Sequence, residues 1–324
     1  MKLFRRKENN ILQKLLLPEI IEINKIRQAV FQYGISGDNE EDSRSIVWKL
    51  LLNVYSCQKH TWEETDNLLH KDYLTFLKDF FPNQKINVTD ETTDADQLLL
   101  YEIDKDVKRL FPKSPFFLEE KNRECIRHIL YVQTKFNKTY PYVQGMNDIA
   151  GVLFYVFAQS TSRARAESTT YYCFAYLMTK ISDWYSPKLD WTSRGIHAQL
   201  ARIDAVLAMK EPELYEHLVL LNITNTLYSF RWVTLLFAQE FPIESVLLVW
   251  DCILVDPTGD FICCLCVSML VEIKRQLLNG DFSYCLKTLQ KYPPSANVHN
   301  IIKRARSFYT ERASFPPLVE PTTV

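Results

Sequence analysis

Apolar side chains recur at three- and four-residue spacing along most of this chain, which is the pattern of helices that each bury one face. The first such segment covers residues 18–33. Pro18 is a favoured first helical residue, and Gly34 can end the helix. The apolar positions between them are Ile23, Ile26 and Val30. The pattern therefore predicts a helix at residues 18–33.

A second helix is predicted to begin at Asp42 or Ser43, because either side chain can cap a helix N-terminus. Arg44 lies one turn before Trp48 in this segment. The apolar residues that share its buried face are Val47, Trp48, Leu51, Leu52 and Tyr55. The same spacing predicts further helices at residues 62–81, 94–110, 118–136, 146–158, 167–183, 195–209, 212–221, 227–240, 242–254, 260–278 and 296–311.

Strands are hard to find in this sequence, because the β-branched and aromatic residues fall mostly at helical spacing. We therefore expect an all-α fold. A chain of 324 residues can form one large domain or two lobes. After the last predicted helix, the proline-containing residues 312–324 are expected to form a flexible tail.

Composition and charge exclude several classes of function. The chain is 47% hydrophobic and 24% charged, as globular proteins are, and its formal net charge is −1. Basic clusters are short and lie near the two ends, so we expect no nucleic-acid partner. The longest apolar run, residues 261–271, is too short to span a bilayer, and Pro18 and Glu19 interrupt the N-terminal leucines. We therefore expect a cytoplasmic protein without a transmembrane segment.

The eight cysteines do not form a recognisable metal or disulfide framework. Three of them lie within one apolar helical segment: Cys263, Cys264 and Cys266. The other five are scattered without C-x-x-C spacing: Cys57, Cys125, Cys173, Cys252 and Cys285. This distribution predicts reduced thiols in a core and no metal site.

Two short polar motifs carry the candidate chemistry. Residues 103–109 have the sequence Ile-Asp-Lys-Asp-Val-Lys-Arg, and residues 142–147 have the sequence Tyr-Val-Gln-Gly-Met-Asn. In nucleotide hydrolysis, an arginine neutralises charge on the γ-phosphate and a glutamine orients the attacking water. Asp106 and Arg109 are three residues apart, so the carboxylate can hold the guanidinium. With Gln144, the pair suggests phosphoryl chemistry.

The chain has no phosphate-binding loop of its own to accompany these motifs. Its seven glycines form neither G-x-x-x-x-G-K-[ST] nor G-x-G-x-x-G. If the protein acts on a nucleotide, another protein must hold it. A plainer interpretation is also open, in which Asp106 and Arg109 form a solvated ion pair worth about 0.3–0.5 kcal/mol. A glutamine in a loop before a helix, such as Gln144, is commonplace.

A third cluster lies near the end of the chain. Trp232 and Trp250 occur on apolar helical faces, which predicts that both are in the core. Arg231 and Asp251 are predicted to form a buried structural pair, with a direct ligand role as the alternative.

In this order, the motifs resemble those of the TBC family of Rab GTPase-activating proteins. The resemblance extends from about residue 34 to the last helices, and one departure is Ser36, where the family usually has proline. The matching motifs are Gly34-Ile35, Arg44 with Trp48, residues 103–109, residues 142–147, Arg231-Trp232, Glu240-Phe241 and Trp250-Asp251.

The resemblance implies a two-lobed, V-shaped helical domain at residues 34–311, preceded by an N-terminal extension and helix at 1–33 and followed by the tail at 312–324. It implies that Arg109 is an arginine finger, that Gln144 is a glutamine finger and that Asp106 orients the arginine. Both fingers would enter a GTP-bound Rab, which itself holds GTP and Mg²⁺. The implied supporting residues are Tyr142 and Asn147 at the glutamine loop, and Arg44, Trp48, Arg231, Trp232, Trp250 and Asp251 in the scaffold.

This resemblance predicts a GTPase activator in vesicle traffic that needs no cofactor of its own and reaches endomembranes through the Rab. One alternative is a catalytically silent helical scaffold that binds a Rab without accelerating hydrolysis. Another is a self-contained hydrolase. The six histidines argue against the latter, because no motif links them to a cysteine nucleophile.

Overall fold

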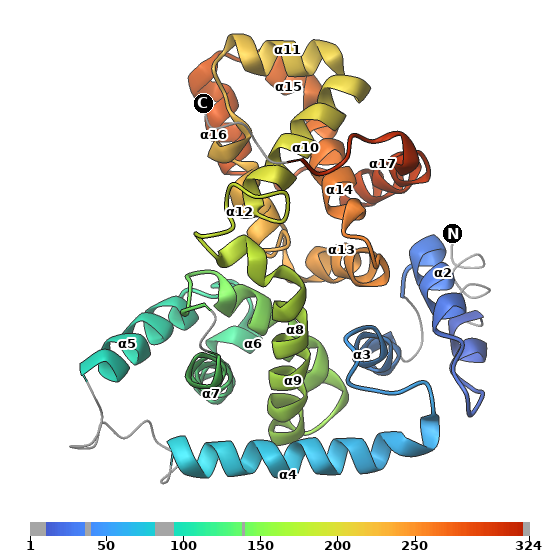
Figure 1. Ribbon diagram of the computed structural model, residues 1–324, viewed down its shortest axis with the longest axis vertical. Helices are drawn as coiled ribbons and strands as arrows, with labels where there is room; N and C mark the ends of the chain where they lie inside the picture. Colours follow the sequence, from blue (N-terminus) through green and yellow to red (C-terminus); the bar gives the residue numbers. More distant parts are fainter. Residues whose placement is uncertain (1–10, 36–39, 82–93, 138–139, 320–324) are drawn as a thin grey trace. The chain divides into compact units, whose positions relative to one another are not determined.

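The computed structural model describes residues 11–35, 40–81, 94–137 and 140–319, and these residues are predominantly helical (Figure 1). In the described part there is no β-strand, only an isolated antiparallel bridge between Ile20 and Gln58. The prediction of an all-α fold is therefore confirmed. The chain divides into two compact units, Met1–Lys180 and Ile181–Val324.

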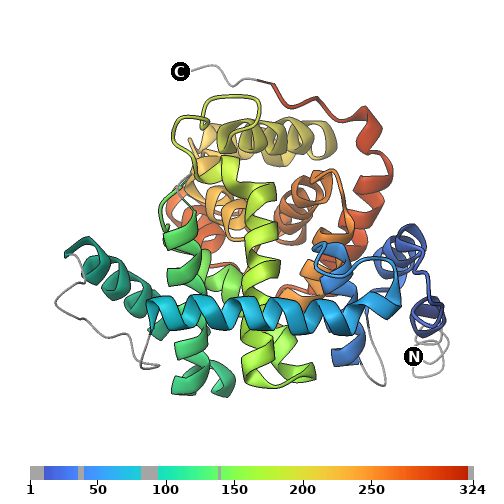
Figure 2. The same ribbon diagram turned by 60° about the horizontal axis from the view of Figure 1, so that its bottom comes forward.

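The first unit is built around α8, whose residues are buried from Met146 to Leu153 without interruption. Helices α3, α5 and α7 all contact α8, and α4 contacts α7. Figure 2 shows this long α4 in the foreground. The helices are α2 (Ile23–Tyr33), α3 (Glu40–Leu51), α4 (Trp62–Phe80), α5 (Asp94–Lys108), α6 (Pro115–Leu118), α7 (Glu120–Phe136), α8 (Met146–Ser160) and α9 (Arg163–Ile181).

Three predicted helix starts in this unit are wrong, and one of them is that of α9, which begins at Arg163 rather than at residue 167. The first helix begins at Ile23 rather than Pro18, because residues 19–21 pair with an extended segment: the Ile21 amide donates to Cys57 at 2.7 Å. The second begins by Glu40, so Asp42 and Ser43 lie inside it instead of capping it. The predicted role of Gly34 is confirmed, because it has φ +76° and its amide donates to Val30 at 2.7 Å.

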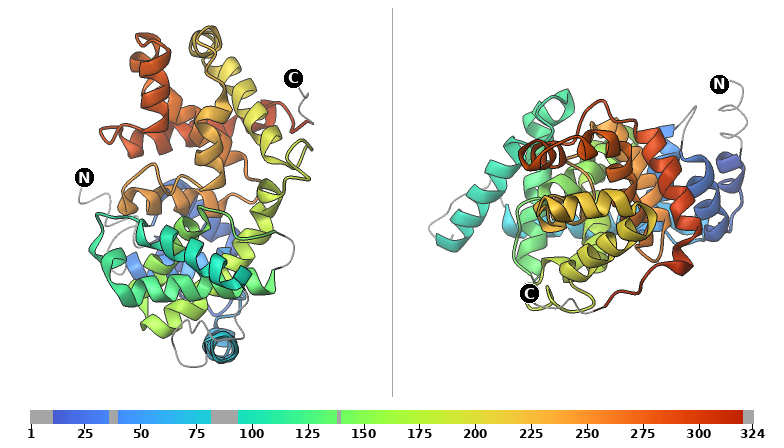
Figure 3. Two further views of the ribbon diagram at one scale, coloured as in Figure 1. Left: turned by 90° about the vertical axis from the view of Figure 1, so that its left-hand side faces the viewer. Right: turned by 90° about the horizontal axis from the view of Figure 1, so that it is seen from above.

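The second unit is organised around α14, which contacts α10, α12, α13 and α17 (Figure 3). Every residue from Phe261 to Leu270 in α14 is buried, including its three cysteines, so the prediction that these are core thiols is confirmed. The helices are α10 (Ile196–Lys210), α11 (Pro212–Leu220), α12 (Ser229–Thr234), α13 (Ile243–Val255), α14 (Asp260–Glu272), α15 (Lys274–Leu278), α16 (Phe282–Gln290) and α17 (Val298–Thr310).

The predicted helix at 227–240 is wrong in its second half. Helix α12 ends at Thr234, and the chain then turns through Leu236 and Phe237, which have φ of +47° and +63°. These left-handed conformations are costly for bulky residues and need support from their surroundings. The Trp250 indole provides some, because its Nε1 donates to the Leu236 carbonyl at 2.9 Å.

Two further differences concern the end of the second unit. Helix α16 is missing from the sequence-based predictions, although Asp281 caps it by accepting from the Tyr284 amide at 2.8 Å. The segment predicted as one helix at 260–278 is broken at Ile273 into α14 and α15.

In the predicted tail, Phe315 is buried. No helix in the described ranges is long and apolar enough to cross a membrane.

Candidate functional site

Arg109 lies directly after the last residue of α5, with about half of its side chain exposed (48%). Its Nη2 donates to Asp106 Oδ1 at 2.7 Å, as the spacing predicts. The Asp106 side chain, however, is only 7% exposed. The pair is therefore not the fully solvated ion pair of the plainer interpretation, because a buried carboxylate holds one side of an outward-facing guanidinium.

The second oxygen of Asp106 is held from another part of the chain. The Tyr142 hydroxyl donates to Asp106 Oδ2 at 2.8 Å, across 36 residues of sequence. Burial, together with the neighbouring Asp106 carboxylate, raises the pKa of Tyr142. The hydroxyl therefore stays protonated and keeps donating at neutral pH. Both carboxylate oxygens have a donor, which fixes the rotamer of Asp106 and with it the orientation of Arg109.

Gln144 is exposed in the loop directly before α8. Gly145 follows it with φ +107°, a conformation that glycine adopts without the cost of a Cβ. Asn147 holds this loop: its Oδ1 accepts from the Gly145 amide at 3.1 Å and its Nδ2 donates to the Asp106 carbonyl at 3.3 Å. The side-chain amide of Asn147 therefore shapes the loop from inside α8.

Asp106 is thus the point at which the two motifs meet. Its side chain binds Arg109 and Tyr142, and its main chain binds Asn147. The structure brings together the five residues predicted for the catalytic and supporting roles in one neighbourhood of the first unit, with Arg109 and Gln144 facing solvent. In the part of the chain that is described, no group of His, Cys, Asp or Glu residues could hold a metal ion.

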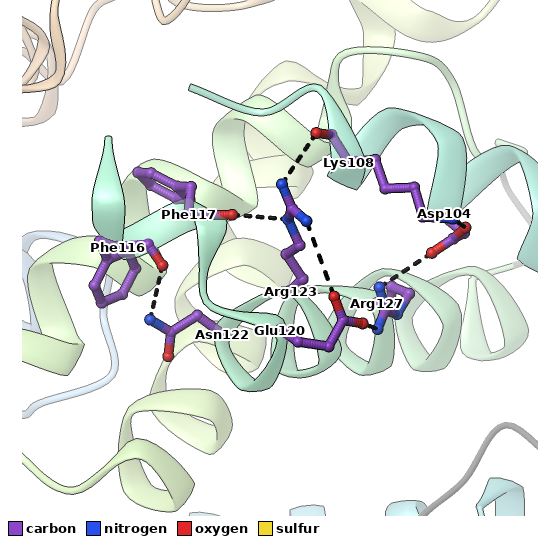
Figure 4. Close-up of polar contacts among 8 residues, drawn as sticks. All are labelled: Asp104, Lys108, Phe116, Phe117, Glu120, Asn122, Arg123 and Arg127. Carbon is purple, nitrogen blue, oxygen red and sulfur yellow. Dashed lines mark hydrogen bonds and ion pairs between the residues drawn. The ribbon is translucent and has the colours of Figure 1, made fainter. Parts of the chain in front are cut away.

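Helix α7 braces the end of α5, and the sequence-based predictions missed these contacts (Figure 4). Arg123 Nε donates to the Phe117 carbonyl at 2.8 Å, and its Nη2 donates to the Lys108 carbonyl at 3.3 Å. Arg127 donates to Asp104 Oδ1 at 3.0 Å and also to Glu120. The available signal was two arginines one helical turn apart, Arg123 and Arg127, within a predicted helix.

The predicted scaffold residues of the first unit are buried. Arg44 is 3% exposed, and its Nη2 donates to the Ile35 carbonyl at 3.0 Å, so it holds the segment that follows Gly34. Trp48 is completely buried. Ser36, where the sequence departs from the resemblance, lies outside the described residues.

In the second unit, the prediction that Arg231 pairs with Asp251 is wrong. Arg231 instead forms a two-pronged pair with Glu240, with distances of 2.8 Å and 2.9 Å, and donates to the Gln290 carbonyl. The planar guanidinium fork matches a carboxylate in this geometry. Trp232, Trp250 and Asp251 are completely buried, which fits the scaffold role predicted for them.

Comparison with known proteins identifies the family to which the chain belongs. The sequence model of the Rab-GTPase-TBC domain matches residues 41–278 of the chain. The chain belongs to this family, the RabGAP-TBC family, whose members act on Rab GTPases. One relative is TBC1 domain family member 5 of Homo sapiens, which is 26% identical over 351 residues. The match covers 89% of this chain and 44% of that protein.

The chain is also similar to TBC1 domain family member 13. The protein from Homo sapiens is 28% identical over 386 residues, which cover 91% of this chain and 96% of that protein. The protein from Mus musculus is 37% identical over 191 residues, which cover 58% of this chain and 48% of that protein.

Two solved structures have the same fold. The Ypt/Rab-GAP domain of Gyp1p superposes with a TM-score of 0.80 at 21% identity, covering 94% of this chain and 99% of that one. The Chlamydomonas flagellar RabGAP TBC domain superposes with a TM-score of 0.64 at 16% identity, covering 94% and 93%. These likenesses identify the fold as that of TBC Rab-GAP domains.

Proposed function

We propose that this protein accelerates GTP hydrolysis by a Rab-family small GTPase and inserts Arg109 and Gln144 into the active site of the GTP-bound Rab. The observation that carries the proposal is the double anchoring of Asp106. Asp106 holds Arg109 with its buried carboxylate, which also binds Tyr142, and its main chain binds Asn147, so the finger arginine is tied to the loop that carries Gln144. A surface ion pair alone requires no such arrangement.

Arg109 suits a role in the transition state. As phosphoryl transfer proceeds, charge builds on oxygens of the γ-phosphate, and an arginine supplied in trans can offset it. Its guanidinium stays charged at all physiological pH values and can contact two oxygens, whereas lysine offers one compact charge. Such a finger is worth about 10³ to 10⁵ in rate, or about 4–7 kcal/mol of barrier.

Gln144 would position the attacking water in place of the glutamine that the GTPase itself carries. Its side chain is free to enter a partner because it lies in an exposed loop. The adjoining Gly145, which has φ +107°, lets the chain turn into α8 directly after Gln144. GTP and Mg²⁺ would be held by the Rab, so the chain acts as an activator rather than as an enzyme with its own substrate site.

The same proposal covers the place of the protein in the cell and its minimal active fragment. We propose that residues 34–311 form the functional Rab-GAP domain and that residues 312–324 are dispensable for it. A cytoplasmic protein of this kind would meet membranes by binding a membrane-attached Rab and would thereby regulate vesicle traffic.

A single-turnover GTP-hydrolysis screen against a panel of GTP-loaded Rabs tests the function directly. We expect strong acceleration of at least one Rab by the wild-type chain and none by Arg109→Lys, which keeps the charge but lacks the planar fork. A chain that binds a Rab but accelerates hydrolysis by no member of the panel would instead be the catalytically silent scaffold.

A further inference from the structure

The end of α5 determines where the Arg109 side chain starts. The amides of Arg109 and Leu110 bond back by three residues, to Asp106 and Val107, both at 3.2 Å. Phe111 then has φ +37°, which is uncommon for a bulky residue. The chain therefore turns sharply directly after the helix, and the carbonyl of Lys108, the last residue of α5, has no partner within the helix. Contacts from elsewhere must hold this turn in place.

Arg123 of α7 makes such a contact. Its guanidinium joins the Lys108 carbonyl, one residue before Arg109, to the Phe117 carbonyl of α6 (Figure 4). The two acceptors lie on opposite sides of the turn at residues 109–114. The Arg123 side chain is only 17% exposed, and of its two bonds the one to the Phe117 carbonyl is partly buried while the one to the Lys108 carbonyl lies at the surface. A cation at the C-terminal end of α5 is also favoured by the helix dipole.

Arg127 secures the preceding turn of α5 by different means. It binds Asp104 Oδ1 at 3.0 Å, while Asp104 Oδ2 pairs with Lys108 Nζ at 2.6 Å. These are contacts between side chains, and they hold the body of the helix. Of the two arginines of α7, Arg123 and Arg127, it is Arg123 that donates to the main chain next to Arg109, at the Lys108 carbonyl.

We propose that Arg123 is a positioning residue for Arg109, which it serves by fixing the main chain from which the finger projects. The inference rests on the proposed function of Arg109. Arg123 directs its guanidinium to two carbonyls of its own chain and to Glu120, with which it forms an ion pair at 3.9 Å, so it is not expected to touch the GTPase. Its loss should therefore affect the catalytic rate more than Rab binding. A displacement of a catalytic group by about 1 Å can cost about 10²-fold in rate.

The variant Arg123→Met removes the guanidinium but keeps a side chain of similar length. We expect kcat for the stimulated Rab to fall about 10- to 100-fold, while the concentration of activator that gives half-maximal rate changes little. Arg123→Lys should recover part of the loss, because an ammonium can still donate to the Lys108 carbonyl but cannot bridge both acceptors.

Arg163→Met is the matched control. Arg163 donates to Asn122 at 2.8 Å and to Glu119, at the start of the same helix α7, and neither partner belongs to α5. This variant also removes a partly buried arginine and its ion pair, so it reports the general cost of loosening α7. We expect it to keep the wild-type kcat even if its melting temperature falls as much as that of Arg123→Met.

Hydrogen exchange of the free protein gives a second readout that needs no GTPase. The amides of Arg109 and Leu110 should exchange faster in Arg123→Met than in Arg163→Met or the wild-type chain. Unchanged protection would overturn the inference, as would a wild-type kcat in Arg123→Met or equal losses in both variants. If the wild-type chain stimulates no Rab, the proposed function fails, and exchange alone decides whether Arg123 holds the end of α5.

Discussion

The hydroxyl of Tyr142 offers a sharp test of how the finger is oriented. The variant Tyr142→Phe removes only the donor to Asp106 Oδ2, a bond of 2.8 Å to a side chain that is 7% exposed. A hydrogen bond to a charged group is worth about 1.5–3 kcal/mol. Because water reaches Asp106 poorly, we expect a loss of about 2 kcal/mol in the free energy of unfolding.

Urea unfolding followed by circular dichroism measures this loss as a lower midpoint at an unchanged slope. Tyr140→Phe is the control, because the Tyr140 hydroxyl is the acceptor of a long 3.5 Å bond from the neutral Gln133 and should cost less. Stimulated GTP hydrolysis by Tyr142→Phe should fall between those of the wild-type chain and Arg109→Ala. Equal stability of the two variants, or full activity of Tyr142→Phe, would refute the orienting role of Asp106.

The pH dependence of this effect follows from the direction of the pKa shift. Burial and Asp106 raise the folded-state pKa of Tyr142, whereas its unfolded value is about 10. The neutral Tyr142 hydroxyl therefore stabilises the folded state fully below about pH 10. This stabilisation is lost as the pH rises through the folded-state pKa. The stability difference between the wild-type chain and Tyr142→Phe should stay constant between about pH 6 and pH 9.

Two further predictions concern the stability of the second unit. Arg231→Met should destabilise by about 1–3 kcal/mol in thermal unfolding, because it leaves the buried Glu240 carboxylate without its cation, while the double variant with Glu240→Leu should recover much of the loss. Burial raises the pKa of Asp204 to about 6. Ionised Asp204 therefore destabilises the fold, and this destabilisation is absent below about pH 4 and grows as the pH rises to about 6. Asp204→Asn should therefore stabilise by about 1–3 kcal/mol at pH 7 and lose this gain by about pH 4, and a gain that does not vary with pH would contradict the assignment.

Helical periodicity predicted most of the fold because each long helix buries one continuous face. It failed where contacts distant in sequence decide the backbone. The Trp250 indole donates to the Leu236 carbonyl and holds a turn there, although the apolar residues of this segment have helical spacing. Residues near Pro18 pair with a segment around Cys57 rather than joining the helix that follows. Neither interaction leaves a local signal in the sequence.

The candidate site shows the same division. The contact between Asp106 and Arg109 follows from a spacing of three residues on a helix. The bond from Tyr142 to Asp106 could not be deduced, because it depends on how the loop before α8 packs against α5. The partner of Arg231 was mistaken for a similar reason. Two carboxylates, Glu240 and Asp251, lay within plausible reach, and the turn after α12 brings the nearer one in sequence to the guanidinium.

The central claim is that Arg109 and Gln144 complete the active site of a bound Rab. The most direct test is single-turnover GTP hydrolysis by the most responsive Rab at saturating concentrations of wild-type chain, Arg109→Ala and Gln144→Ala, with Rab binding and helical content measured alongside. We expect Arg109→Ala to lower the stimulated rate by at least about 10³-fold and Gln144→Ala to abolish stimulation, while both variants stay folded and bind the Rab. Stimulation at the wild-type level by either variant would contradict the account.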